Sequence, residues 1–265
     1  MQKVNVVLII ILVLASGLAS CTGKNDKEKF RKGWTLVLED NFERETGLAA
    51  WSKIPRGKQF MNRYMSNNEA LYVLEDEYLI LRGVENAANN AEIPFLVGGI
   101  TREGFKRNSV GRIEVRARMN PVAGAIPFIT LLPSDGTGNI SIDIMERYGY
   151  DEFIYQSLSS EYTTTEGMAD NPPSNVLVGV NPNQYHIYGV ERYPDSLVFF
   201  VDDIRTKNYP RVLTDIPGQF PFDDINLDLF IGIQLYSDTD PENLPADMFI
   251  DWVRYYEPEA AGMEE

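Results

Sequence analysis

The stretch NISIDIMERYG, residues 139–149, alternates polar and apolar side chains and then breaks the alternation once. Successive side chains of a strand point to opposite faces, so Ser141 and Asp143 share one face of a predicted strand. Glu146 lies an odd number of residues from Ser141 and would face the other way in a regular strand. One extra residue, a β-bulge near the second of two consecutive apolar residues, Met145, returns Glu146 to the polar face. By pattern alone, the same stretch also fits an amphipathic strand with solvated acids.

The rest of the chain repeats strand patterns separated by turn signals. VGRIEVRARM (110–119) alternates strictly from Arg112 onward, with charged residues on one face and apolar residues on the other. This pattern is typical of a half-buried antiparallel strand. YHIYGVERY (185–193) and SLVFFVDD (196–203) predict a hairpin. Residues 227–236 and 248–256 predict two more strands, rich in β-branched and aromatic residues. With no helical stripe of useful length and no internal repeat, the sequence predicts an all-β sandwich in a single domain.

The composition fits one packed domain and argues against one class of partner. The chain has 265 residues, of which 44% are hydrophobic and 11% aromatic, and this is enough for a substantial core. Its formal net charge of −15 argues against nucleic acid, because a protein that neutralises phosphates needs a surplus of Lys and Arg. The acidity indicates no particular partner, since net charge also serves solubility.

The N-terminus reads as an export signal followed by a tether. Residues 1–20 hold a basic Lys3, an apolar run and then small residues, as in a secretory signal peptide, and the run is too short for a stable membrane span. The letters LASC, which end at Cys21, resemble a bacterial lipobox, in which the cysteine is acylated. The alternative is an ordinary signal peptide followed by an unrelated free thiol. Polar residues 21–33 predict a flexible tether, and 34–265 the folded domain.

Acylation of Cys21 would hold the domain at a membrane surface without spanning the membrane. A lone cysteine in an exported protein has no disulfide partner, and lipidation accounts for its presence. The sequence therefore predicts a lipid-anchored protein of the bacterial cell envelope, at the outer membrane or the cell surface.

The chain from residue 34 to its end resembles glycoside hydrolase family 16, the laminarinases and related β-glucanases. SIDIME (141–146) matches the family signature Glu-x-Asp-x-x-Glu in every position but the first. The resemblance implies a concanavalin-like β-jelly roll, in which two antiparallel sheets form a concave glycan cleft. Further matching segments follow in the expected order: WSKIPRGK (51–58), NRYMS (62–66), LVGGIT (96–101), VGRIEVRARM (110–119), YHIYGVERYPDSLVFFVDD (185–203) and MFIDWVRYYE (248–257).

The family's retaining mechanism uses two carboxyl groups about 5–5.5 Å apart, one as nucleophile and one as acid and base. The resemblance puts Glu146 at the acid/base position and Asp143 at the middle position, which hydrogen-bonds the nucleophile in relatives. Ser141 falls on the nucleophile position, where the family has Glu. A neutral, short serine is a weak nucleophile without a base and lends no charge to an oxocarbenium-like transition state. Asp143 lies about 7 Å further along the strand, so it is a poor substitute.

Other positions near the expected cleft also depart from the family. Ile126 and Thr130 stand where relatives commonly have two tryptophans near the sugar. Ser159 stands in place of a histidine and Arg192 in place of an aromatic residue, while QLYSDTDP (234–241) replaces a glycine pair and a tryptophan. Scaffold positions match and site positions do not. The three tryptophans that the chain has are expected at core or edge positions: Trp34, Trp51 and Trp252.

Polar and aromatic residues remain that can hydrogen-bond or stack on a β-linked polysaccharide or oligosaccharide. The expected glycan-binding residues are Arg56, Asn62, Tyr64, Gln234 and Tyr236.

One metal site is a candidate by resemblance, and no other cofactor is expected. Asp251 falls where many relatives place a calcium ligand, and oxygen ligands suit calcium. Asn41 stands where relatives have the other carboxylate, which weakens the case for calcium. His186, the only histidine, lies in a scaffold strand and is predicted to be structural, because one histidine makes no zinc site.

Three functions are compatible with the sequence. The first is a membrane-anchored, inactive or crippled family member that binds a β-linked glycan at the cell surface. The second is an active retaining endo-β-glycosidase of the glucan or galactan class, which the intact Asp143 and Glu146 favour. The third is a lipid-anchored subunit that has lost sugar binding and packs against a partner protein of a glycan-uptake system.

Overall fold

The computed structural model describes the chain at residues 31–75, 77–88, 90–120, 122–136 and 139–259. These residues belong, from Gly33 onward, to one compact unit. The predicted signal peptide at 1–20, the expected lipidated Cys21 and most of the predicted tether lie outside the described residues. Within the described ranges, no helix is long and apolar enough to cross a membrane.

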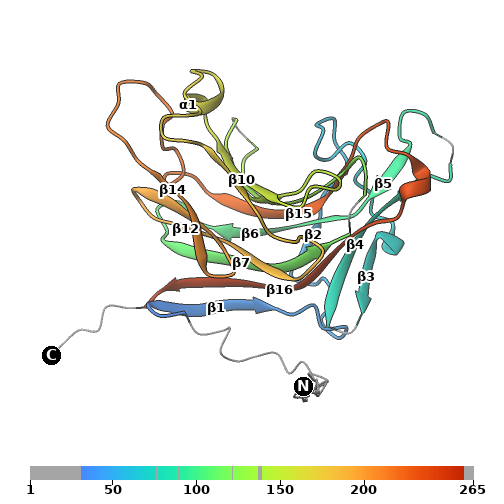
Figure 1. The fold of residues 1–265 in the computed structure, drawn as a ribbon. Coiled ribbons are helices and arrows are strands. Elements are labelled where there is room, and N and C mark those ends of the chain that lie inside the picture. The colour runs from blue at the N-terminus through green and yellow to red at the C-terminus, as the bar shows by residue number, and fades with distance from the viewer. Residues whose placement is uncertain (1–30, 76, 89, 121, 137–138, 260–265) are drawn as a thin grey trace, which may run out of the picture. The chain divides into compact units, whose positions relative to one another are not determined.

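Two antiparallel sheets stack on each other, as predicted for an all-β sandwich (Figure 1). Sheet A has nine strands. Seven run in the order β14 (Ile204–Pro210), β13 (Ser196–Val201), β12 (His186–Arg192), β7 (Gly111–Met119), β16 (Ala246–Pro258), β4 (Tyr78–Glu85) and β3 (Tyr72–Glu75). The other two are β1 (Trp34–Asp40), which pairs with β16, and β5 (Phe95–Val97), which pairs with β4.

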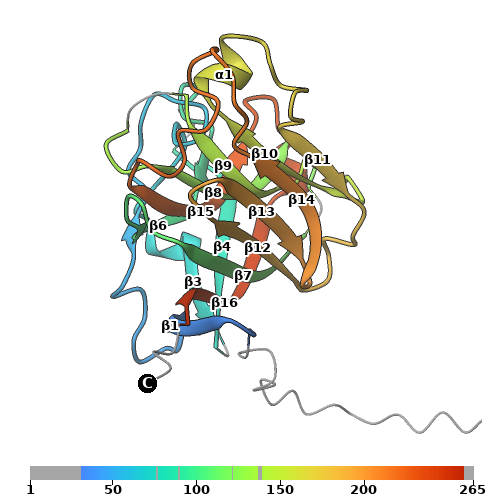
Figure 2. The ribbon, with the colours of Figure 1, turned by 90° about the vertical axis from the view of Figure 1, so that its left-hand side faces the viewer.

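Sheet B has seven strands and carries the bulged stretch in its middle. Their order is β11 (Asn175–Val178), β10 (Ile154–Ser159), β9 (Ser141–Glu146), β8 (Ala125–Pro133), β15 (Leu227–Leu235), β6 (Gly99–Phe105) and β2 (Ser52–Lys53). Helical turns are few and short: α1 (Glu161–Thr164), η2 (Glu69–Leu71) and η3 (Pro241–Asn243). Figures 1 and 2 show α1 and its loops rising beyond the strands of sheet B.

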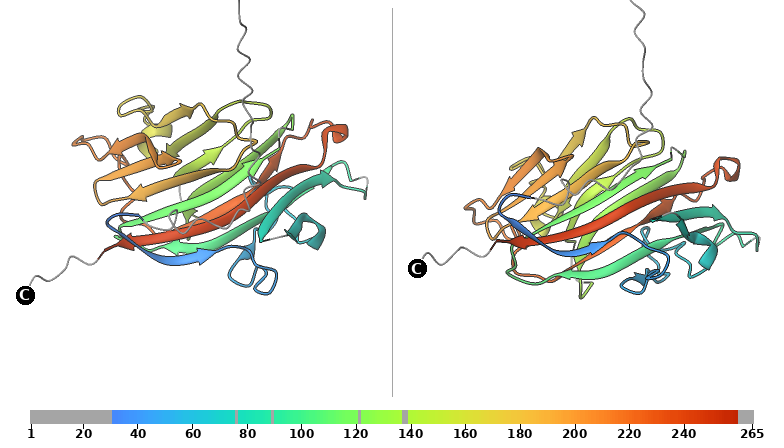
Figure 3. Two further views of the ribbon diagram at one scale, coloured as in Figure 1. Left: turned by 60° about the horizontal axis from the view of Figure 1, so that its bottom comes forward. Right: turned by 90° about the horizontal axis from the view of Figure 1, so that it is seen from below.

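The long strands lie where the sequence predicts them, with ends shifted by at most two residues. The predicted hairpin is β12 with β13, in which Arg192 pairs with Leu197. The longest strand, β16, lies between β7 and β4 in sheet A and also pairs with β1 (Figure 3).

The strand β7 departs from the prediction of a half-buried strand. Arg112 and Glu114, on its charged face, are 6% and 0% exposed. The Arg112 guanidinium donates to Glu114 Oε1 at 2.7 Å and to Glu191 Oε1 at 2.8 Å. Charged side chains tolerate burial when they are paired and hydrogen-bonded, so alternation alone could not reveal it.

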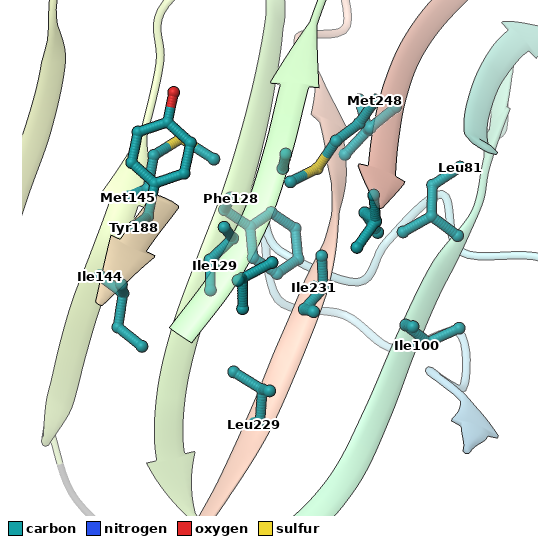
Figure 4. Close-up of a cluster of buried hydrophobic side chains, with 14 of the residues drawn as sticks. Leu81, Ile100, Phe128, Ile129, Ile144, Met145, Tyr188, Leu229, Ile231 and Met248 are labelled. Carbon is teal, nitrogen blue, oxygen red and sulfur yellow. The ribbon is translucent and has the colours of Figure 1, made fainter. Parts of the chain in front are cut away.

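The core lies between the sheets and takes one face of each strand. Figure 4 shows Ile129, Met145 and Ile231 of sheet B gathered with Tyr188 and Met248 of sheet A, and all five are fully buried. Apolar area removed from water contributes roughly 25 cal/mol per Å², so this layer dominates the stability of the sandwich. The expected core positions of two tryptophans are confirmed, with Trp51 9% and Trp252 1% exposed.

Two paired glycines let the segment that contains Ile54 and Met65 pack closely on the outer face of sheet B. Gly99 and Gly232 face each other across β6 and β15. A Cβ on Gly99 would meet Met65 Sδ at 2.8 Å, and one on Gly232 would meet Phe128 Cζ at 2.8 Å. Real Cβ atoms do not approach so closely, so a side chain at Gly99 would have to displace the end of Met65, and one at Gly232 would have to displace the Phe128 ring.

Gly232→Val should therefore destabilise the domain by about 1–3 kcal/mol, because the added atoms overpack the site between Phe128 and Met65. Urea unfolding measures the change. Gly179→Ala is the control, since a Cβ there meets no atom within 4 Å. Equal stability of the Gly232 variant and the control would contradict this account of the packing.

Candidate active site

The bulge predicted in residues 139–149 is present in β9. The pairing of β9 with β8 shifts by one residue between Asp143 and Met145. Ile144 and Met145 are both fully buried, while Ser141, Asp143 and Glu146 are all partly exposed. The three polar side chains therefore share the outer face of sheet B, as the sequence predicts.

Asp143 is held by three hydroxyl groups from three adjacent strands. Thr130 of β8 donates to Oδ1 at 2.7 Å. Ser157 of β10 donates to Oδ2 at 2.9 Å, and Ser141 of β9 donates to the same oxygen at 3.0 Å. Burial raises the pKa of Asp143, and the three hydrogen bonds oppose that rise. The Ser141 hydroxyl is thus already engaged as a donor to its neighbour.

Glu146 is a carboxyl group suited to proton transfer near neutral pH. Burial raises its pKa to about 7, the negative charge of Asp143 adds to the rise, and a hydrogen bond from Tyr148 opposes it. The Tyr148 hydroxyl donates to Oε2 at 3.1 Å. A group whose pKa lies near the working pH can both give and take a proton, which is the requirement for a general acid and base.

The strands next to β9 supply no second carboxylate. Neither β8 nor β10 contains Asp or Glu. Beyond β8, the outer face carries Asp228 of β15, which pairs opposite Leu132 and accepts a hydrogen bond from Ser134 at 2.7 Å. It lies two strand spacings from β9, or roughly 10 Å, and a retaining pair needs about 5–5.5 Å.

The expected glycan-binding residues fall into different environments. Tyr236 is 42% exposed and packs on Phe60, with ring centroids 5.3 Å apart. Arg56 is exposed, and its Nε donates to the Met65 carbonyl at 2.9 Å. Both side chains are therefore accessible from the solvent.

The prediction for Tyr64 is wrong. Its side chain is 6% exposed and packs edge-on against Phe95, with ring centroids 5.9 Å apart, so its ring belongs to the core. Gln234 lies on the outer face of β15, as Asp228 does, but it is only 9% exposed. Asn62 is half-buried, and its Oδ1 is enclosed with no hydrogen-bond partner within the described residues.

Arg192 does not lie at the candidate active site. The family resemblance leads us to expect it there, because it stands where relatives have an aromatic residue near the cleft. It lies at the end of β12 in sheet A and is 1% exposed. Its Nη2 donates to the carbonyls of Asp223 and Ile225 at 3.0 and 2.9 Å. The loss of an aromatic residue there changes the interior and not the outer face of sheet B.

The residues present do not fit the calcium site that the family resemblance suggests. Asp251 pairs with the Arg116 guanidinium, which already neutralises its carboxylate. Asn41 offers a neutral amide oxygen in place of a second carboxylate, so the pair lacks the negative charge on which calcium affinity depends. In the described part of the chain, no three His, Cys, Asp or Glu side chains gather where they could hold a metal ion.

His186 has both ring nitrogens hydrogen-bonded, as predicted for a structural histidine. Nδ1 lies 2.5 Å from Asp202 Oδ2, and Nε2 lies 3.1 Å from the Asn181 carbonyl.

Sequence reasoning missed four side chains at this site: Phe60, Tyr148, Tyr155 and Ser157. Ser157 and Tyr155 could have been found from the alternation of β10, in which every second residue faces the same side as the polar residues of β9. Tyr148 and Phe60 lie in loops, where no periodicity reports direction.

Asp143→Asn should lower the pKa of Glu146 below its value of about 7, because it removes the negative charge that disfavours ionisation. NMR titration of ¹³C-labelled glutamate carboxyls measures the shift. Asp228→Asn, the same change two strands away, should leave the pKa of Glu146 unchanged. An unchanged pKa in the Asp143 variant, or equal shifts in both variants, would contradict the coupling.

Comparison with known proteins places this site in a family. A model of glycosyl hydrolases family 16 matches residues 98–254. A keratan-sulfate endo-1,4-β-galactosidase of Sphingobacterium multivorum is 24% identical over 84% of this chain and 55% of its own length. A β-glucanase of Rhodothermus marinus is 28% identical over 55% of this chain and 57% of its own length. The chain thus spans about half the length of the curated relatives it matches.

A solved structure supports the same fold. It is a non-specific endo-β-1,3(4)-glucanase of family 16, in a variant with one glutamate changed to serine, co-crystallised with 1,3-β-D-cellotriosyl-glucose. Its TM-score is 0.69 at 19% identity, over 86% of this chain and 96% of that chain. With a family model that matches more than half of its length, and with the bulged strand inside that match, this chain belongs to glycosyl hydrolase family 16.

Proposed function

We propose that the domain binds a β-linked polysaccharide or oligosaccharide on the outer face of sheet B and does not cleave it by the family's retaining route. The observation that carries the proposal is the hydroxyl of Ser141, which stands at the nucleophile position and donates to Asp143 at 3.0 Å.

The chemistry of the site supports the loss of the retaining reaction. A serine needs a base to become a nucleophile. Asp143 is the carboxylate beside it, but three hydroxyl donors occupy both Asp143 oxygens. Glu146 is left as the single carboxyl group that is free to exchange protons with a ligand.

The named activities of the relatives support a β-linked glycan as the ligand. Those relatives are a keratan-sulfate endo-1,4-β-galactosidase and a β-glucanase. The glucanase variant with serine in place of a glutamate was co-crystallised with an oligosaccharide, so a family-16 frame with such a change can hold a glycan.

A second function, an active retaining endo-β-glycosidase, is favoured by one observation. Glu146 retains a pKa of about 7 and a hydrogen bond from Tyr148, as an acid/base group requires. This function needs a nucleophile from outside the strands that flank β9 or assistance from the substrate itself.

Attachment to a membrane is part of the first proposal. It rests on the sequence up to Cys21, which resembles a lipobox, and it places the domain at the bacterial cell surface.

Incubation of the purified protein with laminarin, mixed-linkage glucan, agarose and carrageenan separates the two functions. We expect retarded migration in gels that contain one of these polysaccharides and no new reducing ends. Turnover that Glu146→Gln abolishes would overturn the inactive assignment. Absence of both binding and turnover would overturn the glycan-binding assignment.

Ser141→Glu should restore hydrolysis of the polysaccharide that the wild-type protein binds, at least about 100-fold above background. The reason is that it supplies the missing carboxylate opposite Glu146, and such catalytic groups contribute factors of 10² or more. A reducing-sugar assay measures the gain. The double variant Ser141→Glu with Glu146→Gln is the control and should be inactive. A folded Ser141→Glu protein without activity would show that the other departures from the family also block the reaction.

A further inference from the structure

A row of side chains crosses the outer face of sheet B at the level of Glu146. Glu146 of β9 pairs opposite Tyr155 of β10, and Tyr155 pairs opposite Leu177 of β11. Residues paired directly across antiparallel strands share a face and have Cβ atoms about 4.5–5.5 Å apart. Tyr155 and Leu177 therefore continue the candidate active site toward the edge of the sheet.

The Tyr155 ring is held in place by its neighbours. It packs edge-on against Tyr148, with centroids 4.9 Å apart and planes at 84°, and against Phe153 at 5.4 Å. Tyr148 in turn donates a hydrogen bond to Glu146. The aromatic cluster and the carboxyl group thus form one connected surface, and a rigid ring loses little entropy when it binds a ligand.

This edge of the sheet offers both apolar area and hydrogen-bonding groups. Leu177 is 57% exposed on the edge strand. Two residues further along β10, on the same face of the sheet, Ser157 lies opposite Asn175, whose side chain is exposed. A surface that combines a ring, an aliphatic side chain and polar groups suits the two kinds of surface of a pyranose, its apolar face and its hydroxyl rim.

A second exposed aromatic pair lies on the opposite side of Glu146. Phe60 and Tyr236 are 39% and 42% exposed and pack on each other. Tyr236 comes directly after β15, two strands beyond β9 in sheet B. From β15 to β11 the sheet spans four strand spacings, about 19 Å, which fits an oligosaccharide rather than a single sugar.

We propose that Tyr155 and Leu177 form a sugar-binding platform, the edge platform, that holds a β-linked glycan chain as it crosses the sheet over Glu146. The apolar face of one sugar ring packs on Tyr155 and Leu177, while Ser157 and Asn175 bind its hydroxyls. The Phe60–Tyr236 pair holds the other end of the chain. The inference rests on the proposed glycan-binding function and adds to it a contact region at the edge strand β11.

Affinity electrophoresis in laminarin, mixed-linkage glucan, agarose and carrageenan tests the edge platform with two variants. Leu177→Ser changes an exposed side chain and should leave the fold intact, and Tyr155→Ala removes the ring. Each should weaken binding of the retained polysaccharide by about tenfold, the loss expected for one aromatic or apolar contact with the ligand. Tyr155→Phe keeps the ring and should bind within about twofold of the wild type. Ile204→Ser, at a 71% exposed position in sheet A, is the matched control and should bind as the wild type does.

Oligosaccharides of increasing length, made from the retained polysaccharide, supply a second readout by calorimetry. Wild-type affinity should rise with length until the chain reaches the edge platform, and in Leu177→Ser that last rise should vanish. If the wild-type protein binds and both variants bind equally well at every length, the edge platform is refuted while glycan binding stands. If the wild-type protein retains none of the four polysaccharides, the proposed function fails and the edge platform fails with it.

Discussion

The arrangement of the candidate site depends on one extra residue in β9. Ile144 and Met145 both enter the core between the sheets, which a regular strand does not allow for consecutive residues. The bulge that accommodates them returns Glu146 to the outer face, beside Ser141 and Asp143. Core packing and site geometry therefore share a single constraint. Removal of either buried side chain would disturb the direction of the carboxyl group as well as the stability of the sandwich.

Three hydroxyl groups supply the side-chain hydrogen bonds of Asp143. In the family, the neighbour two residues before this aspartate is an acid, whereas here Ser141, Ser157 and Thr130 all donate to the Asp143 carboxylate. Three neutral donors satisfy both oxygens of a largely enclosed acid, and this lowers the free-energy cost of enclosing it. The Ser141 hydroxyl is therefore part of the hydrogen-bonding of Asp143, and a change at position 141 would alter the environment of that carboxyl group as well.

The fold and the bulge could be predicted from sequence because both follow from side-chain periodicity. Two neighbouring apolar residues in an alternating strand are enough to locate Met145 at a bulge. Periodicity could not show that Tyr64 packs against Phe95, because its segment is a loop, nor that Arg192 points into the interior of the sandwich. The aromatic contacts of Phe60 were missed for the same reason: they join segments far apart in the chain, and no local pattern records them.

The pairing of β1 with β16 sets the layer in which the folded domain begins. Trp34 pairs with Pro258 in sheet A, so the chain enters the domain in the layer opposite to the outer face of sheet B. A label or a solid support attached at Trp34 therefore starts from the layer that does not carry Glu146, and it leaves the outer face of sheet B clear for a ligand.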